Sequence, residues 1–241
     1  MNPIIVVPAR MASTRLPGKP LADINGKPMI VRVLERCMEA GIGPVIVATP
    51  DCQIANVAVK NGFRPVITDG GLASGSDAVW DAIQKFDPDE KHDVVVNVQG
   101  DQVGVTTRHI VSSFHPLADW RVQIGTLVAP LDGPDCDDMG IVKAIVLLDS
   151  GQYFGKALYF SRLPIPLGPG PMWRHIGIYA YRRDALKNFT AMKPSSLELR
   201  ERLEQLRALE NDMIIGCCKV DSAPLEVNTQ ADLDRVRGLI H

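Results

Sequence analysis

Short aliphatic runs alternate with helical patterns through the first hundred residues of the chain. Continuous apolar, β-branched runs predict buried strands at 4–7, 44–49, 65–68 and 94–99. Apolar positions at helical spacing predict helices between them, with Asp51 able to cap the second, at 28–41, 51–62 and about 75–86. This alternation of strand and helix predicts a mainly parallel sheet that is covered on both faces.

The second half of the chain has more strand patterns and fewer helical ones. We expect strands at 121–129, 141–148, 173–182 and 213–220. The strand at 173–182 alternates between an aromatic and polar face and an aliphatic face that is expected to point into the core. Between 161 and 172, four prolines predict an irregular loop.

Two helices complete the predicted pattern. Ser195 and Glu198 form a capping box for a helix whose apolar stripe consists of Leu199, Leu203, Leu206 and Leu209. A last helix begins near Thr229, with Asp232 placed to reach back to the cap. The chain contains no repeat, low-complexity tract or linker, so we expect one α/β domain over 1–241 with a β-rich piece inserted at about 130–180.

Composition excludes several classes of protein. The chain is 46% hydrophobic and 22% charged, as is usual for a globular protein, and its net charge of −2 argues against a nucleic-acid binder. No apolar run approaches the ~20 residues of a membrane helix, and Pro8 and Arg10 interrupt the first run too early for a signal peptide. Five cysteines without metal or redox spacing indicate reduced thiols, so we expect a cytoplasmic protein with no nucleic-acid or membrane partner.

The loop after the first predicted strand concentrates positive charge. It carries Arg10, Arg15 and Lys19 together with Ser13, Thr14 and Gly18. Because ligands of open α/β sheets bind at the carboxyl ends of the strands, the loop is placed to meet one. Three cations on a short loop favour a polyphosphate ligand. The alternative is an ordinary solvated basic loop.

Two further segments carry candidate chemistry. Asp101 follows the strand at 94–99 and Gly100, and a carboxylate in that position can hold Mg²⁺ together with substrate phosphates, although Gly-Asp is also a common turn. Ser74 and Gly75 stand at a predicted helix start, where free backbone N–H groups can hold a base or a phosphate. Ser74 could equally serve only as the helix cap.

Blocks along essentially the whole chain resemble one enzyme family, the 3-deoxy-manno-octulosonate cytidylyltransferases or CMP-Kdo synthetases. The blocks occur in the family's order: PARMASTRLPGKPL (8–21), INGKPMI (24–30), SGSD (74–77), VNVQGD (96–101), LYFSR (158–162), RHIGIYAYR (174–182) and LEQLRALE (203–210). The resemblance implies a Rossmann-like nucleotidyltransferase fold and a homodimer held partly by the β-rich piece. It also implies a cytoplasmic reaction of CTP with Kdo that gives CMP-Kdo and pyrophosphate for lipopolysaccharide synthesis.

The resemblance assigns roles to residues of this chain. It implies Arg10, Lys19 and Asp101 as catalytic residues and places the nucleotide on Ala9, Arg10, Ser13, Arg15, Lys19, Ser74 and Gly75. It implies Mg²⁺ as the cofactor, with the metal positions at Asp101 and Asn228. It places the sugar acid on Gln99, Tyr159, Arg162, His175, Tyr179, Glu204 and Gln205. The tyrosines could instead be packing residues, His175 a core imidazole and Glu204 a solvated side chain.

Four departures from the family pattern lie close to these residues. Asn228 stands where a metal-binding aspartate is usual, and Ala78 stands where an arginine is usual. Gln102-Val103 and Met139-Gly140 also replace the residues usual at their positions. The chain is therefore either a working enzyme with altered metal or acceptor preference, or a degenerate paralogue that binds nucleotide with little turnover.

Two other enzyme classes share parts of this pattern. A CMP synthetase for another sugar acid, such as an amino-Kdo or a nonulosonate, would share the nucleotide site and differ in the acceptor pocket. A hexose-1-phosphate nucleotidyltransferase is disfavoured, because the first loop lacks the Gly-x-Gly segment usual in that class.

Overall fold

The structure, a computed structural model, describes residues 1–13, 15–148 and 151–239. The residues group into two compact units. The first unit comprises Met1–Ile110 and Pro224–His241, and the second comprises Val111–Ala223. The division falls within helix α4 (Thr107–Phe114). In the described part of the chain, no helix has the length and apolar character needed to cross a membrane.

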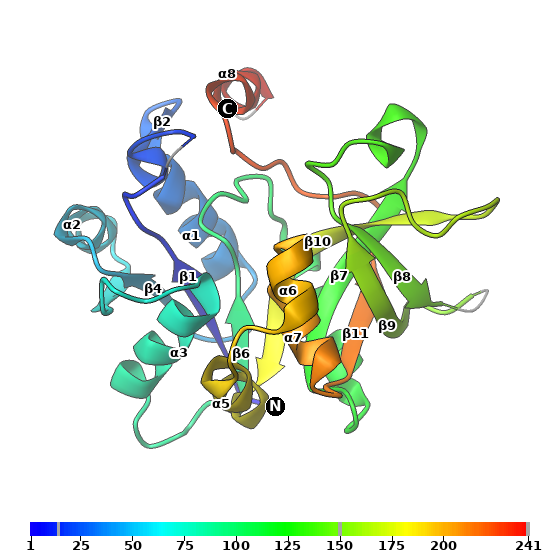
Figure 1. Cartoon of the computed structure of the whole chain (residues 1–241). Helices are drawn as coiled ribbons and strands as arrows, with labels where there is room; N and C mark the ends of the chain where they lie inside the picture. Colours follow the sequence, from blue (N-terminus) through cyan, green and yellow to red (C-terminus); the bar gives the residue numbers. More distant parts are fainter. Residues whose placement is uncertain (14, 149–150, 240–241) are drawn as a thin grey trace. The chain divides into compact units, whose positions relative to one another are not determined.

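The first unit is built on four parallel strands. Their order is β5 (Arg64–Ile67), β4 (Val45–Thr49), β1 (Pro3–Pro8) and β6 (Val94–Asn97). Almost every residue of β1 and β6 is buried, which explains why these strands are continuous apolar runs. Helices α1 (Met29–Glu39), α2 (Cys52–Lys60) and α3 (Gly75–Phe86) pack against them (Figure 1). All seven elements lie within two or three residues of the predicted bounds.

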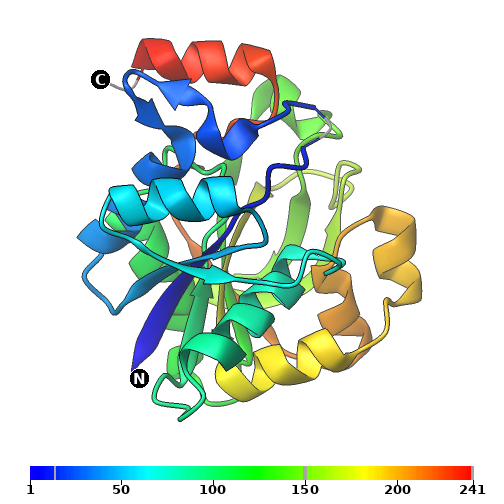
Figure 2. The same ribbon diagram turned by 90° about the vertical axis from the view of Figure 1, so that its left-hand side faces the viewer.

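The segment after the second unit returns to the first. Helix α8 (Gln230–Leu239) lies beside the hairpin of β2 (Asp23–Ile24) and β3 (Lys27–Pro28), as Figure 2 shows. Asn25 Nδ2 donates to the carbonyl of Arg237 at 2.8 Å, and Arg237 Nε donates to the carbonyl of Asp23 at 3.0 Å. This attachment places residues 224–229 in the same unit as the loop that follows β1.

The second unit is a mixed sheet with helices. Its strand order is β10 (Met172–Arg182), β7 (Ile124–Leu131), β11 (Ile215–Lys219), β9 (Phe154–Ser161) and β8 (Lys143–Leu147), and β8 also pairs with β10. Helix α7 (Gln205–Glu210) packs on β9 and on α6 (Ser196–Glu201), and α5 (Arg183–Ala191) packs on β10. The short helices η2 (His115–Ala118) and η3 (Gly133–Cys136) complete the unit, as η1 (Lys19–Leu21) does in the first.

The predicted β-rich piece at about 130–180 lies inside the second unit, which begins earlier and ends later. The reason is strand pairing, because β7 and β11 join strands of that piece in one sheet. The sequence predicts one compact domain over 1–241, whereas the structure groups the residues into two compact units.

The helix predicted from Ser195 through Leu209 is wrong as a single element. The capping box of Ser195 and Glu198 is present, but α6 ends at Glu201 and Arg202 adopts a left-handed conformation with φ 57°. Leu199 is 66% exposed, so it does not belong to an apolar stripe. The prediction also lacked α4, β9 and α5, and it treated β10 as covered on one face only. Both His175 and Ile176 of β10 are buried, and a register shift follows Ile176.

Candidate active site

The loop that follows β1 is anchored to neighbouring chain segments by its backbone. Ala9 N donates to the carbonyl of Ala48 at 2.9 Å, and Met11 N donates to Asp51 Oδ2 at 2.7 Å. Asp51 was predicted as the side-chain cap of α2, but it makes no capping hydrogen bond and holds the loop instead. Gly18, just before Lys19, has φ 70°, a conformation that glycine adopts without a steric penalty.

A cleft of about 380 Å³ opens at the carboxyl ends of the parallel strands in the first unit. It brings together every residue predicted to bind the nucleotide, namely Ala9, Arg10, Ser13, Arg15, Lys19, Ser74 and Gly75. Gln99 and Asp101 line the same cleft, whereas Thr14 lies outside the described residues. The predicted convergence of the cationic loop and the carboxylate is therefore present.

Asp101 and Lys19 form an ion pair within this cleft. Lys19 Nζ lies 2.6 Å from Asp101 Oδ2 and also donates to the carbonyl of Val227 at 3.1 Å. Val227 N in turn donates to the carbonyl of Asp101 at 3.0 Å. One carboxylate and one ammonium, both only partly exposed, are thereby fixed beside the segment that leads to Asn228.

Asn228 presents its amide oxygen to the cationic loop. Its Oδ1 accepts from Arg15 Nη2 at 3.0 Å, while its backbone N donates to Asp232 Oδ2 at 3.0 Å at the start of α8. Asp232 thus reaches back to the helix start as predicted. With Asp101, the site offers one carboxylate and one neutral oxygen, both hard donors. No group of three His, Cys, Asp or Glu side chains suited to a metal occurs in the described residues.

The Asp101 carboxylate and the Asn228 amide oxygen fit a Mg²⁺ site in which the protein supplies only some of the metal ligands. Mg²⁺ is commonly bound by one or two carboxylates, with waters and substrate phosphates completing its shell. The two oxygens now accept from Lys19 and Arg15, so a cation already lies against each of them.

The departure at Gln102-Val103 is explained by packing. Both residues are buried, and Gln102 Nε2 donates to Glu226 Oε1 at 3.3 Å. Gly104 N donates to the carbonyl of Leu225 at 3.0 Å, and a Cβ at position 104 would lie 2.4 Å from Leu225 N. The turn is therefore fitted to residues 225–226, and neither Gln102 nor Val103 lines the cleft. Ala78, by contrast, does line the cleft.

Ser74 serves as the helix cap, one of the two roles considered for it. Its Oγ accepts from Asp77 N at 3.1 Å, and Asp77 completes a capping box. Ser74 also lines the cleft, and its contact with a nucleotide remains a prediction.

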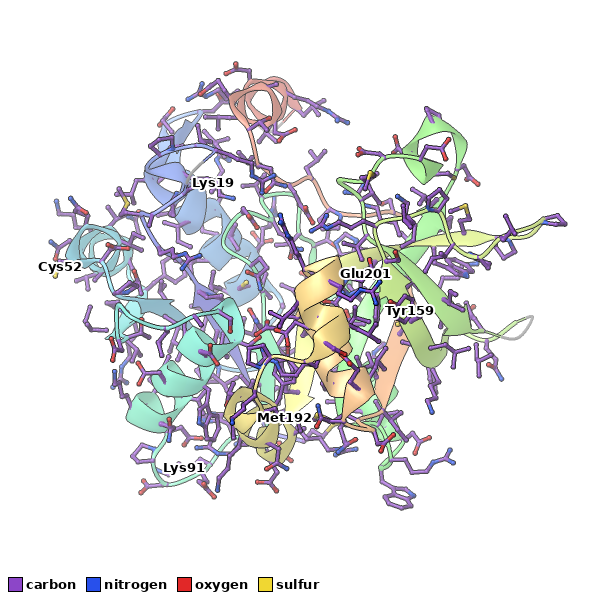
Figure 3. All side chains as sticks on the ribbon, in the orientation of Figure 1. Lys19, Cys52, Lys91, Tyr159, Met192 and Glu201 are labelled. Carbon is purple, nitrogen blue, oxygen red and sulfur yellow. The ribbon has the colours of Figure 1, made fainter. Side chains whose placement is uncertain are left out.

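The remaining residues predicted to bind the sugar acid belong to the second unit. Tyr159 donates to Glu201 Oε1 at 3.3 Å, and Figure 3 labels both side chains. Burial raises the pKa of the Tyr159 phenol, and the nearby Glu201 carboxylate adds to this shift. Arg162 Nη1 donates to the carbonyls of Met139 at 3.1 Å and Gly140 at 3.5 Å, so the departure at 139–140 contributes backbone acceptors rather than side chains.

His175 is a buried, neutral imidazole. Its Nε2 lies 3.1 Å from Thr126 Oγ1, and its ring packs at 4.8 Å against Phe160 and at 5.5 Å against Tyr179. Burial lowers the pKa of His175 to about 3. Burial likewise holds the pKa of Tyr179 well above its ordinary value, with smaller contributions from Tyr181 and Glu204. At neutral pH both groups can take part in hydrogen bonds but carry no charge.

Glu204 and Gln205 stand at the start of α7. Glu204 Oε1 lies 3.6 Å from Arg207 Nη2, so Glu204 is not the solvated side chain considered as an alternative. Gln205 is buried. Their contact with a ligand remains a prediction.

The sequence analysis did not identify four residues, of which two contact predicted sugar-binding residues in the second unit and two line the cleft of the first unit. Glu201 accepts from Tyr159 and from Ser161 Oγ at 3.0 Å, and Thr126 faces His175. Nothing in their spacing could have found them, because their partners are far away in the sequence. Thr68 and Asp69 line the cleft, and their position at the carboxyl end of the strand predicted at 65–68 is a signal that could have identified them.

Comparison with known proteins defines the class. A family model described as "Cytidylyltransferase" matches residues 4–215. The chain therefore belongs to the cytidylyltransferase family, whose members are nucleotidyltransferases.

Relatives that match over nearly their full length carry a more particular name. The chain is 49% identical over 241 residues to the 3-deoxy-manno-octulosonate cytidylyltransferase of Paramagnetospirillum magneticum, covering 100% of this chain and 98% of that protein. It is 52% identical over 240 residues to the protein of the same name from Rhodospirillum rubrum, covering 99% and 95%. A solved structure of CMP:2-keto-3-deoxy-manno-octonic acid synthetase complexed with CTP has a TM-score of 0.91 at 35% identity, covering 100% and 98%. The resemblance and the α/β nucleotidyltransferase fold predicted from the motifs are confirmed.

Proposed function

We propose that this chain transfers CMP from CTP to the anomeric hydroxyl of 3-deoxy-manno-octulosonate and releases pyrophosphate, as a step in lipopolysaccharide synthesis. One observation carries the proposal: Arg10, Arg15, Lys19 and Asp101 line one cleft at the strand ends. Full-length relatives named for this activity support it. Such a displacement at phosphorus depends mainly on positioning and charge neutralisation, which this cleft can provide.

The cations of the loop are assigned to the triphosphate. Arg10 and Arg15 are exposed in the cleft and can donate to phosphate oxygens. Lys19 and Arg15 neutralise the charge that grows on departing pyrophosphate. Mg²⁺, held by Asp101 and the Asn228 amide oxygen, would supply further polarisation of the phosphoryl oxygens when it is bound.

Within the second unit, the acceptor is assigned to the side chains predicted to bind it. Arg162 suits the carboxylate of a sugar acid, because two of its N–H groups can meet two oxygens. Tyr179 keeps its proton and can donate to a hydroxyl. Tyr159 donates its proton to Glu201, so its oxygen can accept from a hydroxyl. His175 is neutral, so it is assigned a hydrogen bond rather than a charge.

Pyrophosphate release tests the proposal directly. The full chain is incubated with CTP, Mg²⁺ or Mn²⁺, and a panel of Kdo, an amino-Kdo and a nonulosonate, and CTP binding is measured separately. We expect release to be fastest with Kdo. Release with a different acid would identify the alternative CMP synthetase, and CTP binding without any release would identify a degenerate paralogue.

Asn228→Asp tests the second metal position. If Asn228 lies at that position, the added carboxylate strengthens Mg²⁺ binding, and we expect half-maximal activity at an Mg²⁺ concentration roughly tenfold lower. The measurement is a Mg²⁺ titration of pyrophosphate release, with Asn188→Asp as the control, because Asn188 is exposed on α5. An unchanged or weaker response to Mg²⁺ would show that position 228 is not a ligand in this chain.

A homodimer is the proposed assembly. Leu147 of β8, Phe154 and Leu158 of β9, and Tyr153 just before β9 are all exposed, by 43 to 74%. Large apolar side chains gathered on adjacent strands are typical of a surface that a second copy covers. Sedimentation should then give about twice the chain mass of 26.3 kDa, and a single-chain mass at micromolar concentration would contradict this assembly.

A cytoplasmic location is proposed as well. All five cysteines are free thiols in the structure, as is usual where glutathione keeps proteins reduced. Cell fractionation with an antibody to the chain tests this, and recovery in the periplasm would contradict it.

A further inference from the structure

One end of the cleft is acidic and has no part in the mechanism above. Thr68 and Asp69 follow β5 directly and line the cleft. Strand β4 separates β5 from β1, and adjacent strands are about 4.8 Å apart, so this end lies roughly 10 Å from the end of β1. A carboxylate repels a triphosphate, so this end suits a different part of the ligand.

The Asp69 carboxylate is held in place and leaves one oxygen available. Asp69 N donates to Asp81 Oδ2 at 3.0 Å, and Lys85 Nζ fixes Asp81 from 2.7 Å while also donating to the carbonyl of Ile67 at 3.1 Å. Asp69 Oδ1 accepts from Gly71 N at 2.9 Å. Within the described ranges, Asp69 Oδ2 takes part in no hydrogen bond or ion pair.

Thr68 supplies a second available group. The residue is only 5% exposed, and its backbone N donates to the carbonyl of Thr49 at 3.0 Å. Its Oγ1 is buried and has no hydrogen-bond partner among the residues that the structure describes. A buried hydroxyl in that state destabilises a fold unless a ligand completes it. Two neighbouring residues of the cleft therefore each offer an unused acceptor.

We infer that Thr68 and Asp69 read the exocyclic amine of cytosine and so select CTP over UTP. The amine has two N–H donors, which match one carboxylate oxygen and one hydroxyl oxygen. Uracil carries a carbonyl oxygen at the same position, and the Asp69 carboxylate repels it. The inference rests on the proposed function, because it assigns the base of the nucleotide whose phosphates meet Arg10, Arg15 and Lys19.

The discriminating variant is Asp69→Asn. Its amide can donate to the uracil oxygen and accept from the cytosine amine, so the charge-based preference is lost. We expect the ratio of kcat/KM for CTP to that for UTP to fall by about tenfold or more. The control is Asp89→Asn, because Asp89 is exposed, does not line the cleft and forms an ion pair with Lys91 at 3.2 Å.

Thr68→Val gives an independent readout of the hydroxyl. The change keeps the shape and removes the unpartnered oxygen, so we expect the melting temperature to rise by about 3 °C. The KM for CTP should rise about fivefold in the same variant, because the amine loses one acceptor. A purely structural role for Thr68 would leave that KM unchanged.

The outcomes separate this inference from the proposed function. If the natural chain releases pyrophosphate with neither CTP nor UTP, the proposed function fails. If it releases pyrophosphate with CTP and Asp69→Asn leaves the CTP to UTP ratio within twofold of the control, the inference is overturned while the proposed function stands.

Discussion

Replacing Asp101 with asparagine is expected to lower kcat/KM for CMP transfer by about 10³-fold, the range typical for removing one preorganised charge from a reacting centre. Asparagine keeps the shape of the side chain but removes the charge that pairs with Lys19 at 2.6 Å. It also removes the single carboxylate of the proposed Mg²⁺ site. Lys19 would remain bonded to the Val227 carbonyl, so the loss reflects charge rather than a collapsed loop.

The rate of pyrophosphate release, measured over a range of CTP concentrations at saturating Kdo, gives kcat/KM and tests this effect. Calorimetric binding of CTP and thermal denaturation show that the variant is folded. Asp132→Asn is the matched control, since Asp132 is exposed and its side chain caps nothing. Activity of Asp101→Asn within tenfold of the control would mean that Asp101 is not part of the reacting centre.

Replacing Arg207 with methionine is expected to be the most damaging change to stability. Arg207 makes two hydrogen bonds to Glu198, at 2.6 and 2.8 Å, and its guanidinium lies 4.8 Å from the centre of the Phe189 ring. The side chains of Arg207 and Glu198 are only 6% and 12% exposed. Removing one partner leaves a buried charge, which costs about 3–5 kcal/mol. This corresponds to a fall in melting temperature of roughly 10 °C.

The pH dependence of the effect identifies its source. Burial alone would raise the pKa of Glu198, but the hydrogen bonds from Arg207 and the Ser195 backbone outweigh it and hold the pKa below its ordinary value. The pair therefore stabilises the fold above the pKa of an unfolded glutamate and loses this contribution as the pH falls through the lower folded value. Calorimetric melting of Arg207→Met and the natural chain should converge on acidification. Arg200→Met is the control, because Arg200 is exposed on α6. Equal melting temperatures for the two variants at neutral pH would contradict the assignment.

The features predicted well are those that depend on local sequence. Strand β1 reads as a continuous apolar run because it is buried on both faces. The cationic loop and Asp101 could be expected close together because each follows a parallel strand, although their ion pair through Lys19 was not predicted. The features missed depend on contacts between distant residues. The left-handed conformation of Arg202 ends a helix that helix propensity alone would continue. The Asp51 side chain accepts a hydrogen bond from Met11 N and does not cap the helix that its position suggests.

The position of residues 224–239 has a consequence for the order in which the protein is made. They complete the first unit, yet they follow the whole of 111–223 in the chain. During synthesis, the loop with Lys19 emerges early but lacks the Val227 carbonyl and the Asn228 amide until the second unit has been translated. A nascent chain thus carries the proposed metal and phosphate site in incomplete form through most of its translation. Truncation after Ala223 would remove the contacts of Val227 and Asn228 from a cleft whose lining residues all lie within the first 101.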